Sequence, residues 1–168
     1  MRATRIRLRP ATADDNADLV AMRNASSRDL TLRHGRGPWS GETSDKGVRF
    51  EMTRGTIFIA RRSNKLIAAL TLSTRKPWAI DRKCFTPCNR PLYLTGMLVD
   101  PSLQRAGIGR LCIEEARRIA AAWPADSICL DAWDAGAGAG EFYRKCGFRE
   151  VGRAIYRTAP LIYFEMLL

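Results

Sequence analysis

The segment LYLTGMLVDPSLQRAGIGRLCIEEARRIAAAW, residues 92–123, passes from a strand pattern through a glycine-containing loop to a helix pattern. Its first eight residues are nearly all apolar, which is typical of a strand in the middle of a sheet. An Asp-Pro pair ends that strand. From about Gly107 to Ala122, apolar side chains recur at helical spacing, and Pro124 ends the helix. The segment therefore predicts a buried strand, a loop and a long amphipathic helix.

The loop, residues 104–110, has the features of a phosphate site. The first amides of a helix have no acceptor within the helix, and the helix dipole favours negative charge at that end. Gly107 and Gly109 allow the backbone to approach a ligand closely, while Arg105 and Arg110 add positive charge. A pyrophosphate is the group that we expect here.

Three phosphate-loop patterns can be compared with this loop. The P-loop requires lysine and then serine or threonine after its second glycine, where this chain has arginine and leucine. The dinucleotide fingerprint requires a small third residue three positions after Gly109, where Cys112 stands. The third pattern is Gln-x-x-Gly-x-Gly, placed after a strand that ends in Val-Asp-Pro. Gln104, Gly107 and Gly109 match it fully.

The rest of the chain alternates between strand and helix patterns. Helices are expected after Thr12, from about Ser44, and within residues 134–146, after a glycine-rich loop. Further strands are expected over residues 6–11, 56–62, 65–75, 127–132, 148–157 and 161–168. Residues 26–55 give no clear overall pattern, although residues 33–44 are rich in turn formers. Residues 76–91 form a long excursion with three prolines. This order predicts an α/β fold with a mixed sheet.

Composition sets broad limits. The 168 residues are 46% apolar and 27% charged, which predicts one globular domain over residues 1–168. No apolar run reaches the roughly 18 residues of a membrane span, and no signal peptide is visible, so we expect a cytoplasmic protein that binds no membrane. The five cysteines, an odd number, fit reduced thiols. Cys84 and Cys88 are the close pair, and with one histidine distant in sequence we expect no metal site.

The net charge of +11 and the isoelectric point of about 10.1 favour polyanionic partners, such as nucleic acid or a phosphorylated cofactor. A nucleic-acid-binding module is therefore one alternative function. However, the basic residues are scattered over every segment and form no stripe interleaved with aromatic residues, so nucleic acid is a disfavoured partner. The same charge disfavours a free polycation as substrate.

A second segment, EFYRKCGF at residues 141–148, completes a resemblance. Together with Gln-x-x-Gly-x-Gly it resembles the GNAT (GCN5-related) superfamily of acyl-CoA-dependent N-acetyltransferases, in which an aromatic-Tyr-x-x-x-Gly-Phe segment follows the fifth strand. The resemblance is strong over residues 92–153 and extends to the whole chain in element order. It implies a mixed, mostly antiparallel central sheet, a splay between the fourth and fifth strands, and about four flanking helices.

The resemblance implies acetyl-CoA as cosubstrate and no metal. The pyrophosphate would bind the loop residues Gln104, Arg105, Ala106, Gly107, Ile108, Gly109 and Arg110. The pantetheine arm would run beside the backbone of Met97, Leu98 and Val99, and Gly96 would mark an irregularity in the strand.

The resemblance also implies catalytic roles. We expect the Leu98 N–H to donate to the oxyanion and Tyr143 to protonate the departing thiolate. Alternatively, Tyr143 only packs and contacts the pantetheine sulfur. Phe142 and Phe148 are expected in the core.

The general base stays open, because the fourth strand carries none of the carboxylates that many relatives have there. Glu51, Asp131 and Asp134 are candidates, acting directly or through water, and some relatives simply bind neutral amine. His34 is a further, weaker candidate in the segment that would face the acceptor.

Two departures from the family pattern concern the cofactor. Gly136 stands where relatives often have an asparagine, so backbone amides would substitute for a side-chain contact. Arg144 and Lys145 could reach the 3′-phosphate of CoA or form a solvated helix face. The acceptor site is expected from residues 26–55, residues 76–91 and the end of the fifth strand, with possible apolar walls from Trp39, Phe50, Trp78 and Trp133.

The resemblance thus predicts transfer of an acyl group to a primary amine of a small molecule by direct attack. An alternative is a protein acceptor, ribosomal or N-terminal. A non-catalytic CoA sensor on the same fold is a further alternative. We expect the protein to be a monomer or a homodimer.

Overall fold

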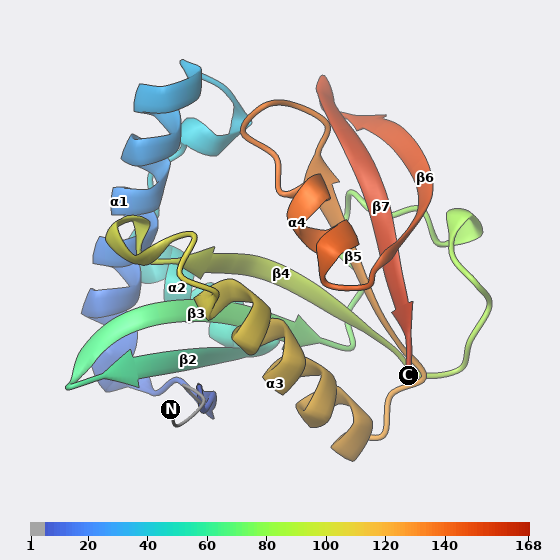
Figure 1. The fold of residues 1–168 in the computed structure, drawn as a ribbon, viewed down its shortest axis with the longest axis horizontal. Helices are drawn as coiled ribbons and strands as arrows, with labels where there is room; N and C mark the ends of the chain where they lie inside the picture. Colours follow the sequence, from blue (N-terminus) through green and yellow to red (C-terminus); the bar gives the residue numbers. More distant parts are fainter. Residues whose placement is uncertain (1–5) are drawn as a thin grey trace.

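The computed structural model describes residues 6–168, which form a seven-stranded sheet with helices on both faces (Figure 1). The order across the sheet is β1-β2-β3-β4-β5-β7-β6. The strands are β1 (Arg9–Pro10), β2 (Thr56–Arg62), β3 (Lys65–Ser73), β4 (Pro91–Val99), β5 (Ser127–Trp133), β6 (Arg149–Tyr156) and β7 (Ala159–Leu167). The β4–β5 pair is parallel and the other pairs are antiparallel. The predicted fold class is confirmed, although β1 is much shorter than residues 6–11.

Four α-helices accompany the sheet: α1 (Asn16–His34), α2 (Asp45–Met52), α3 (Ile108–Ala122) and α4 (Gly140–Lys145). Ser44 caps α2 by accepting a hydrogen bond from the Gly47 amide at 3.1 Å. The sequence left residues 26–32 without an assignment, and in the structure α1 continues through them to His34. The second half of α1 lacks a continuous apolar stripe, so its sequence carried no helical period.

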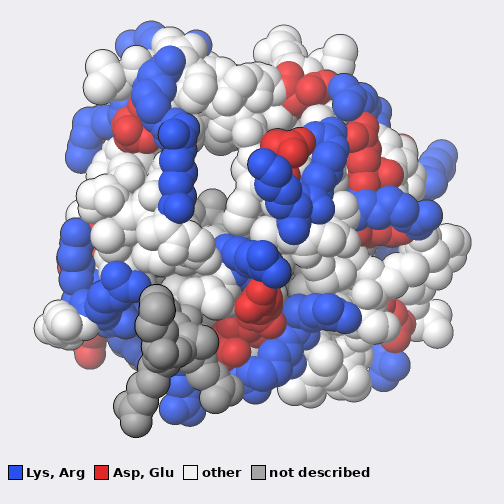
Figure 2. Space-filling view, viewed as in Figure 1, with Lys and Arg blue, Asp and Glu red and all other residues white. Residues whose placement is uncertain are grey.

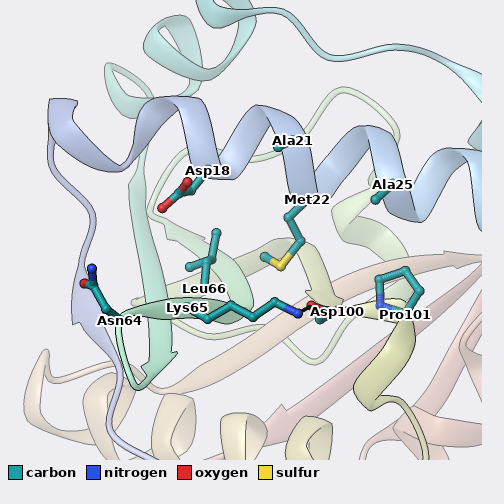
Figure 3. A pocket seen from close by; sticks show the side chains of 9 residues that line it. All are labelled: Asp18, Ala21, Met22, Ala25, Asn64, Lys65, Leu66, Asp100 and Pro101. Carbon is teal, nitrogen blue, oxygen red and sulfur yellow. Dashed lines mark ion pairs between the residues drawn. The ribbon is translucent and has the colours of Figure 1, made fainter.

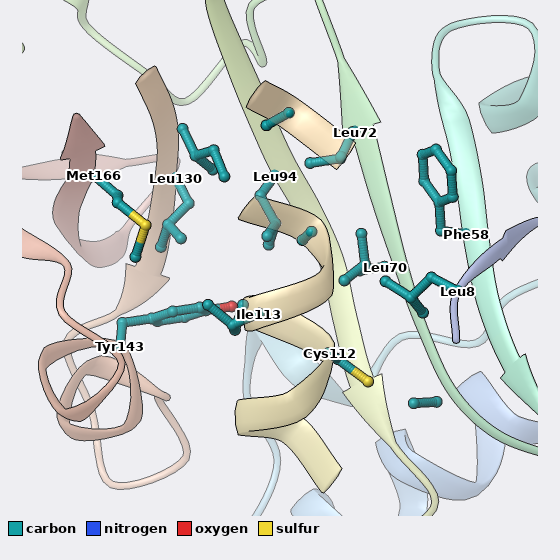
Figure 4. Close-up of a cluster of buried hydrophobic side chains, with 14 of the residues drawn as sticks. Leu8, Phe58, Leu70, Leu72, Leu94, Cys112, Ile113, Leu130, Tyr143 and Met166 are labelled. Atoms are coloured by element: carbon teal, nitrogen blue, oxygen red, sulfur yellow. The ribbon is translucent and has the colours of Figure 1, made fainter. Parts of the chain in front are cut away.

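Apolar side chains are buried in three clusters. The largest lies between the sheet and the α3–α4 layer, and Figure 4 shows part of it. On the opposite face, α1 and α2 cover β2 and β3 with a second cluster that includes Leu19 and Val48. A third cluster covers β5 and β7 on that same side and includes Phe85 and Tyr163. The second face is therefore covered by two separate layers, with a gap between them over β3 and β4.

The excursion at residues 76–91 forms the second of these layers. The Tyr163 hydroxyl donates to the carbonyl of Ala79. The buried carboxylate of Glu165 accepts from the Thr86 amide at 2.9 Å, from the Thr86 hydroxyl, and from Arg149. Although burial opposes it, these partners lower the pKa of Glu165. β7 thus holds the excursion in place through polar contacts.

The sheet opens between β4 and β5. Their pairing runs from Pro91–Ser127 to Tyr93–Cys129, and beyond it the strands diverge. Figure 2, drawn in the same orientation as Figure 1, shows an opening through the molecule between the α1 side and the α4 side. The Trp39 and Trp133 rings meet edge to face at 5.6 Å and join the two sides. The predicted splay is confirmed, and it forms a passage between the two faces.

Among residues 6–168, no helix is both long and apolar enough to cross a membrane. Within the same range, no group of three or more His, Cys, Asp or Glu side chains could hold a metal ion. The five cysteines are free thiols.

Candidate active site

The loop before α3 presents unpaired amides. Gly107 precedes the helix with φ of 80°, in the left-handed region that favours glycine. The Leu111 amide donates to the Gly107 carbonyl at 3.2 Å, as the first i→i−4 bond of the helix. The amides of residues 108–110 therefore have no acceptor within α3 and are available to an anion. Ile108 is buried and anchors this helix end in the core.

Asp100 shapes the start of the same loop. Its carboxylate accepts from the Ser102 amide at 2.9 Å and pairs with Lys65 at 2.8 Å. The bonds from Lys65 and Ser102 lower the pKa of Asp100. Figure 3 shows Lys65 reaching Asp100 along a cavity of about 320 Å³ between α1 and β3. We did not single out Asp100 from the sequence, although aspartate directly before proline is a signal for the start of a helical turn.

The two segments that carry the family resemblance touch each other. A Cβ built on Gly109 would lie 3.1 Å from two ring atoms of Phe142 on α4. A larger residue would require the Phe142 ring to shift by a few tenths of an ångström, so Gly109 allows the start of α3 and α4 to pack closely. Gln104 connects the loop back to β4, because its side-chain amide donates to the Val99 carbonyl at 3.4 Å.

Positive charge surrounds the loop. Arg105 and Arg110 are exposed, and Arg110 forms a surface ion pair with Glu114 at 3.1 Å. On α4, Arg144 pairs with Glu150 at 2.7 Å and Lys145 with Glu141 at 3.7 Å. Arg144 and Lys145 already have acidic partners. This favours the hypothesis that they form a solvated helix face over the hypothesis that they contact the 3′-phosphate of CoA.

A bulge interrupts β4 at the point where the strands diverge. Thr71 pairs with Thr95 and Ala69 with Leu98, so one residue of β3 opposes two of β4. Gly96 lies inside this irregularity with φ of 58°. The expectation that Gly96 marks a break in the strand is confirmed.

The pairing register decides where the β4 amides point. The Asp100 amide donates to Ile67 of β3 at 2.9 Å, and Leu98 pairs with Ala69 two residues away. Since hydrogen-bonded pairs alternate along an antiparallel ladder, the Leu98 amide also faces β3. The amides of Val99 and Met97 therefore point away from β3, toward the opening between β4 and β5. Leu98 lies beside the bulge as expected, but its amide has a sheet partner.

Tyr143 lies in the large core cluster, with 6% of its surface exposed. Its ring contacts Phe142, Phe148 and Phe164 at centroid distances of 5.2 to 5.9 Å, and in Figure 4 it points from α4 toward α3. No hydrogen bond among residues 6–168 involves its hydroxyl. Burial, followed by the charge of Asp131, raises the pKa of Tyr143.

Asp131 lies on β5, beside the opening between β4 and β5. It lies two residues beyond the last β4–β5 pair, Tyr93–Cys129, and on the same sheet face as Cys129. No other side chain in residues 6–168 pairs with its carboxylate, and burial raises the pKa of Asp131. An unpaired carboxylate in a cleft is a candidate proton acceptor.

The other two carboxylate candidates already have partners. Glu51 pairs with Arg23 and accepts from the Thr71 hydroxyl. Asp134 pairs with Arg153 at 2.8 Å. Glu51 nevertheless lies near the bulge, because Oε1 is 3.5 Å from the position of a Cβ on Gly96. Its position suits substrate binding better than proton transfer.

The four candidate aromatic walls divide into two pairs. Trp39 and Trp133 close the outer side of the passage, and there the His34 Nδ1 lies 3.5 Å from the position of a Cβ on Gly136. Phe50 and Trp78 line a separate pocket of about 310 Å³ between α2 and the excursion, over Thr71 and Thr95. This pocket fills the gap between the two apolar layers of the second face.

Comparison with known proteins agrees with this geometry. Residues 19–148 match the model of the acetyltransferase (GNAT) family. Among curated proteins, none matches the sequence significantly.

Solved structures share the fold at low identity. A GCN5-related N-acetyltransferase from Rhodopseudomonas palustris superposes with a TM-score of 0.74 at 17% identity, covering 100% of this chain and 99% of that one. A ribosomal-protein-alanine N-acetyltransferase from Brucella melitensis gives 0.70 at 18% identity, covering 96% and 99%. The ribosomal-protein-S18-alanine N-acetyltransferase of Escherichia coli gives 0.70 at 16%, covering 96% and 93%. From the family match over most of its length, the chain belongs to the GNAT acetyltransferase family.

Proposed function

We propose that this protein transfers the acetyl group of acetyl-CoA to a primary amine of a small molecule. The observation that carries the proposal is the passage through the splayed sheet. The amide-lined loop before α3 lies near one side of it, and the pocket over Thr71 and Thr95 lies on the opposite face. A donor and an acceptor approaching from opposite faces would meet at the β4 bulge.

The residues present fit coenzyme A. The free amides of residues 108–110 and the exposed Arg105 and Arg110 suit a pyrophosphate. Met97 and Val99 present strand-like amides along the open edge of β4, which suits the pantetheine arm. When bound, acetyl-CoA would supply an acyl group activated as a thioester.

The chain's own groups account for the remaining chemistry. The Met97 amide, within the bulge, is our choice of oxyanion donor in place of Leu98. Asp131 takes the proton of the attacking amine, directly or through water, and Tyr143 gives its proton to the departing sulfur. The C–N bond forms, the C–S bond breaks, and the proton gained by sulfur balances the proton lost by nitrogen.

Asp131 and Tyr143 are coupled in this scheme. Burial, and after it the negative charge of Asp131, raises the pKa of Tyr143, so the phenol holds its proton while Asp131 is ionised. When Asp131 accepts a proton that charge disappears, and Tyr143 becomes a stronger acid as the thiolate leaves.

The size and makeup of the pocket support a small acceptor. A volume of about 310 Å³ lies in the range of small-molecule sites. The chain's own elements complete the passage, so the proposal needs no partner subunit, whether the protein is a monomer or a homodimer. A protein acceptor is the alternative outcome of the test below.

Thermal unfolding with acetyl-CoA tests the cofactor. At a hundred times the dissociation constant, binding adds about 2.7 kcal/mol, which corresponds to a rise of about 5 to 10 °C in Tm for a chain of this size. Thiol release with a panel of small primary amines, checked by the mass of the product, then tests transfer. Absence of a shift at millimolar acetyl-CoA would overturn the proposal. A shift with acetylation of peptide N-termini alone would replace the small acceptor by a protein.

A further inference from the structure

The pocket over Thr71 and Thr95 has an unusual balance of charge. Its lining comes from α2, β3, β4 and the start of the excursion, and it includes three cationic residues and one acid: Arg54, Arg75, Lys76 and Glu51.

The cations are not neutralised by acids. Arg54 and Arg75 form no ion pair within residues 6–168. The backbone of Arg54 is fixed, because its carbonyl accepts from the Ser73 hydroxyl at 2.6 Å and its amide donates to Glu51 at 2.9 Å. The Lys76 ammonium donates to the carbonyls of Pro77 and Ile80, at 3.0 and 2.7 Å, rather than to a carboxylate. The side chains of Arg54, Arg75 and Lys76 therefore bring positive charge to the pocket, and none of them is paired with an acid within residues 6–168.

Glu51, the one acid of the pocket, does not balance these charges. Its carboxylate pairs with Arg23 from α1 and accepts from the Thr71 hydroxyl at the pocket floor. It lies at the end of the pocket nearest to Gly96. The pocket therefore has a polar, acid-containing end at the bulge and excess positive charge contributed by Arg54, Arg75 and Lys76.

Two large aromatic side chains flank the cationic residues. Phe50 is 61% exposed and Trp78 is 81% exposed, and the Arg54 guanidinium lies over the Phe50 ring at 5.6 Å. Exposed aromatic rings next to unpaired arginines offer both apolar contact and charge to one ligand.

We propose that the acceptor amine also carries an anionic group, a carboxylate or a phosphate, which Arg54 and Arg75 bind while the amine faces the bulge. This inference rests on the proposed acetyl transfer and names its substrate class. Charge-assisted hydrogen bonds to guanidinium groups are among the stronger polar contacts, and they orient the ligand. The ligand's apolar part lies against Phe50 and Trp78.

Matched acceptors test the charge requirement. 4-(Aminomethyl)benzoate, its primary amide and benzylamine share a primary amine and an aromatic ring, but only the benzoate carries an anionic group. O-Phosphoethanolamine and ethanolamine form the corresponding phosphate pair. We expect kcat/KM for at least one anionic member to exceed that of its neutral partner by about tenfold or more. We also expect this ratio to fall as salt screens the pocket.

Paired variants locate the effect. In the double variant Arg54→Gln, Arg75→Gln, the ratio of kcat/KM for the anionic acceptor to kcat/KM for its matched partner should fall to within about twofold. A control double variant, Arg49→Gln with Arg117→Gln, removes the same charge outside the pocket and should keep the preference. The charge-conserving variant Arg54→Lys, Arg75→Lys should keep part of the preference for the anionic acceptor. Similar unfolding temperatures of all the variants would show that the substitutions leave the fold intact.

The outcomes separate this inference from the proposed function. If acetyl-CoA stabilises the protein and amines are acetylated, but neutral and anionic partners react equally, the anionic acceptor is wrong and acetyl transfer stands. The same conclusion follows if the arginine-to-glutamine variant keeps the preference. If acetyl-CoA gives no thermal shift and no amine releases thiol, the transfer reaction itself is wrong, and this inference fails with it.

Discussion

The loop before α3 and the pocket between α2 and the excursion are the two proposed binding regions, and they are built differently. The loop uses backbone amides and glycines from one continuous segment, residues 104–110. The pocket uses side chains from α2, β3, β4 and the excursion, which are far apart in sequence. The first depends on local conformation, whereas the second depends on the packing of two separate layers.

This difference suggests where variation in function arises. A backbone site binds the same diphosphate whatever the neighbouring side chains are, because the helix end supplies the amides. A site made of converging side chains changes its ligand when one layer shifts or one residue changes. We therefore expect variants of the loop to change the affinity for acetyl-CoA, and variants of the pocket to change the KM for the amine. Variants of Asp131 and Tyr143 should change the rate of turnover.

Tyr143→Phe gives the largest expected effect. Loss of the general acid should lower kcat by about 10²- to 10³-fold, while acetyl-CoA binding changes little because the ring and its packing stay. Steady-state rates together with titration of acetyl-CoA measure the two quantities. An unchanged kcat would mean that Tyr143 only packs in the core and is not the general acid.

Asp131→Asn should lower kcat/KM by about 10²-fold and remove the acid limb of its pH profile. Burial raises the pKa of Asp131, so the folded state holds this proton more tightly than the unfolded state does. The wild-type protein therefore loses stability as pH rises from the unfolded pKa through the folded one. The amide should remove that loss and raise Tm at neutral pH.

Asp134→Asn is the matched control for Asp131, because Asp134 pairs with Arg153 on the surface. We expect its rate and its pH profile to resemble those of the wild type. A larger loss of activity in this control than in Asp131→Asn would reverse the assignment of the base.

Glu165→Gln tests the layer that carries the excursion. Glu165 is 1% exposed and holds Thr86 and Arg149, so its loss should cost about 2 kcal/mol of unfolding free energy, the scale of hydrogen bonds to a charged group. Arg149 is largely exposed and can return to solvent, which limits the cost. Denaturant unfolding measures the loss, with Glu141→Gln as an exposed control.

The same variant separates the two regions. If the excursion forms one wall of the acceptor pocket, Glu165→Gln should raise the KM for the amine and leave acetyl-CoA affinity unchanged. An equal loss of both affinities would show that the regions are not independent.

Gly107→Ala has the smallest expected effect. No atom lies within 4 Å of the new Cβ, so the cost is the left-handed conformation alone, about 1 kcal/mol. We expect roughly a fivefold loss of acetyl-CoA affinity by titration, with the KM for the amine unchanged. Gly41→Ala, which also meets no atom but has an ordinary φ of −70°, should behave like the wild type. Equal behaviour of the two variants would mean that the conformation at Gly107 does not matter.

Local signals accounted for much of the fold. The turn at Ser63 and Asn64 was readable, and both residues have positive φ in the structure. The end of β4 and the start of α3 were also expected, because their signals lie within a few residues of each other. The second half of α1 was missed, since its helical state depends on contacts with α2 and η2 (Pro38–Ser40), which no local pattern records.

The candidate site divides in the same way. The loop residues 104–110 and Tyr143 were expected from motifs. Glu51, Asp131 and Asp134 were indistinguishable as carboxylates in sequence, and their partners separated them in the structure. The direction of the Leu98 amide depended on a register with β3 that a strand pattern does not reveal.

The sequence by itself determined the strand, the glycine loop and the long helix of residues 92–123, because turn chemistry and apolar period act over a few residues. The tertiary structure alone decided which side chains meet: Gly109 against Phe142, Glu51 beside Gly96, and Arg54 and Arg75 around one pocket. Those contacts join residues up to tens of positions apart, and their geometry follows from how the layers pack on the sheet rather than from any local preference.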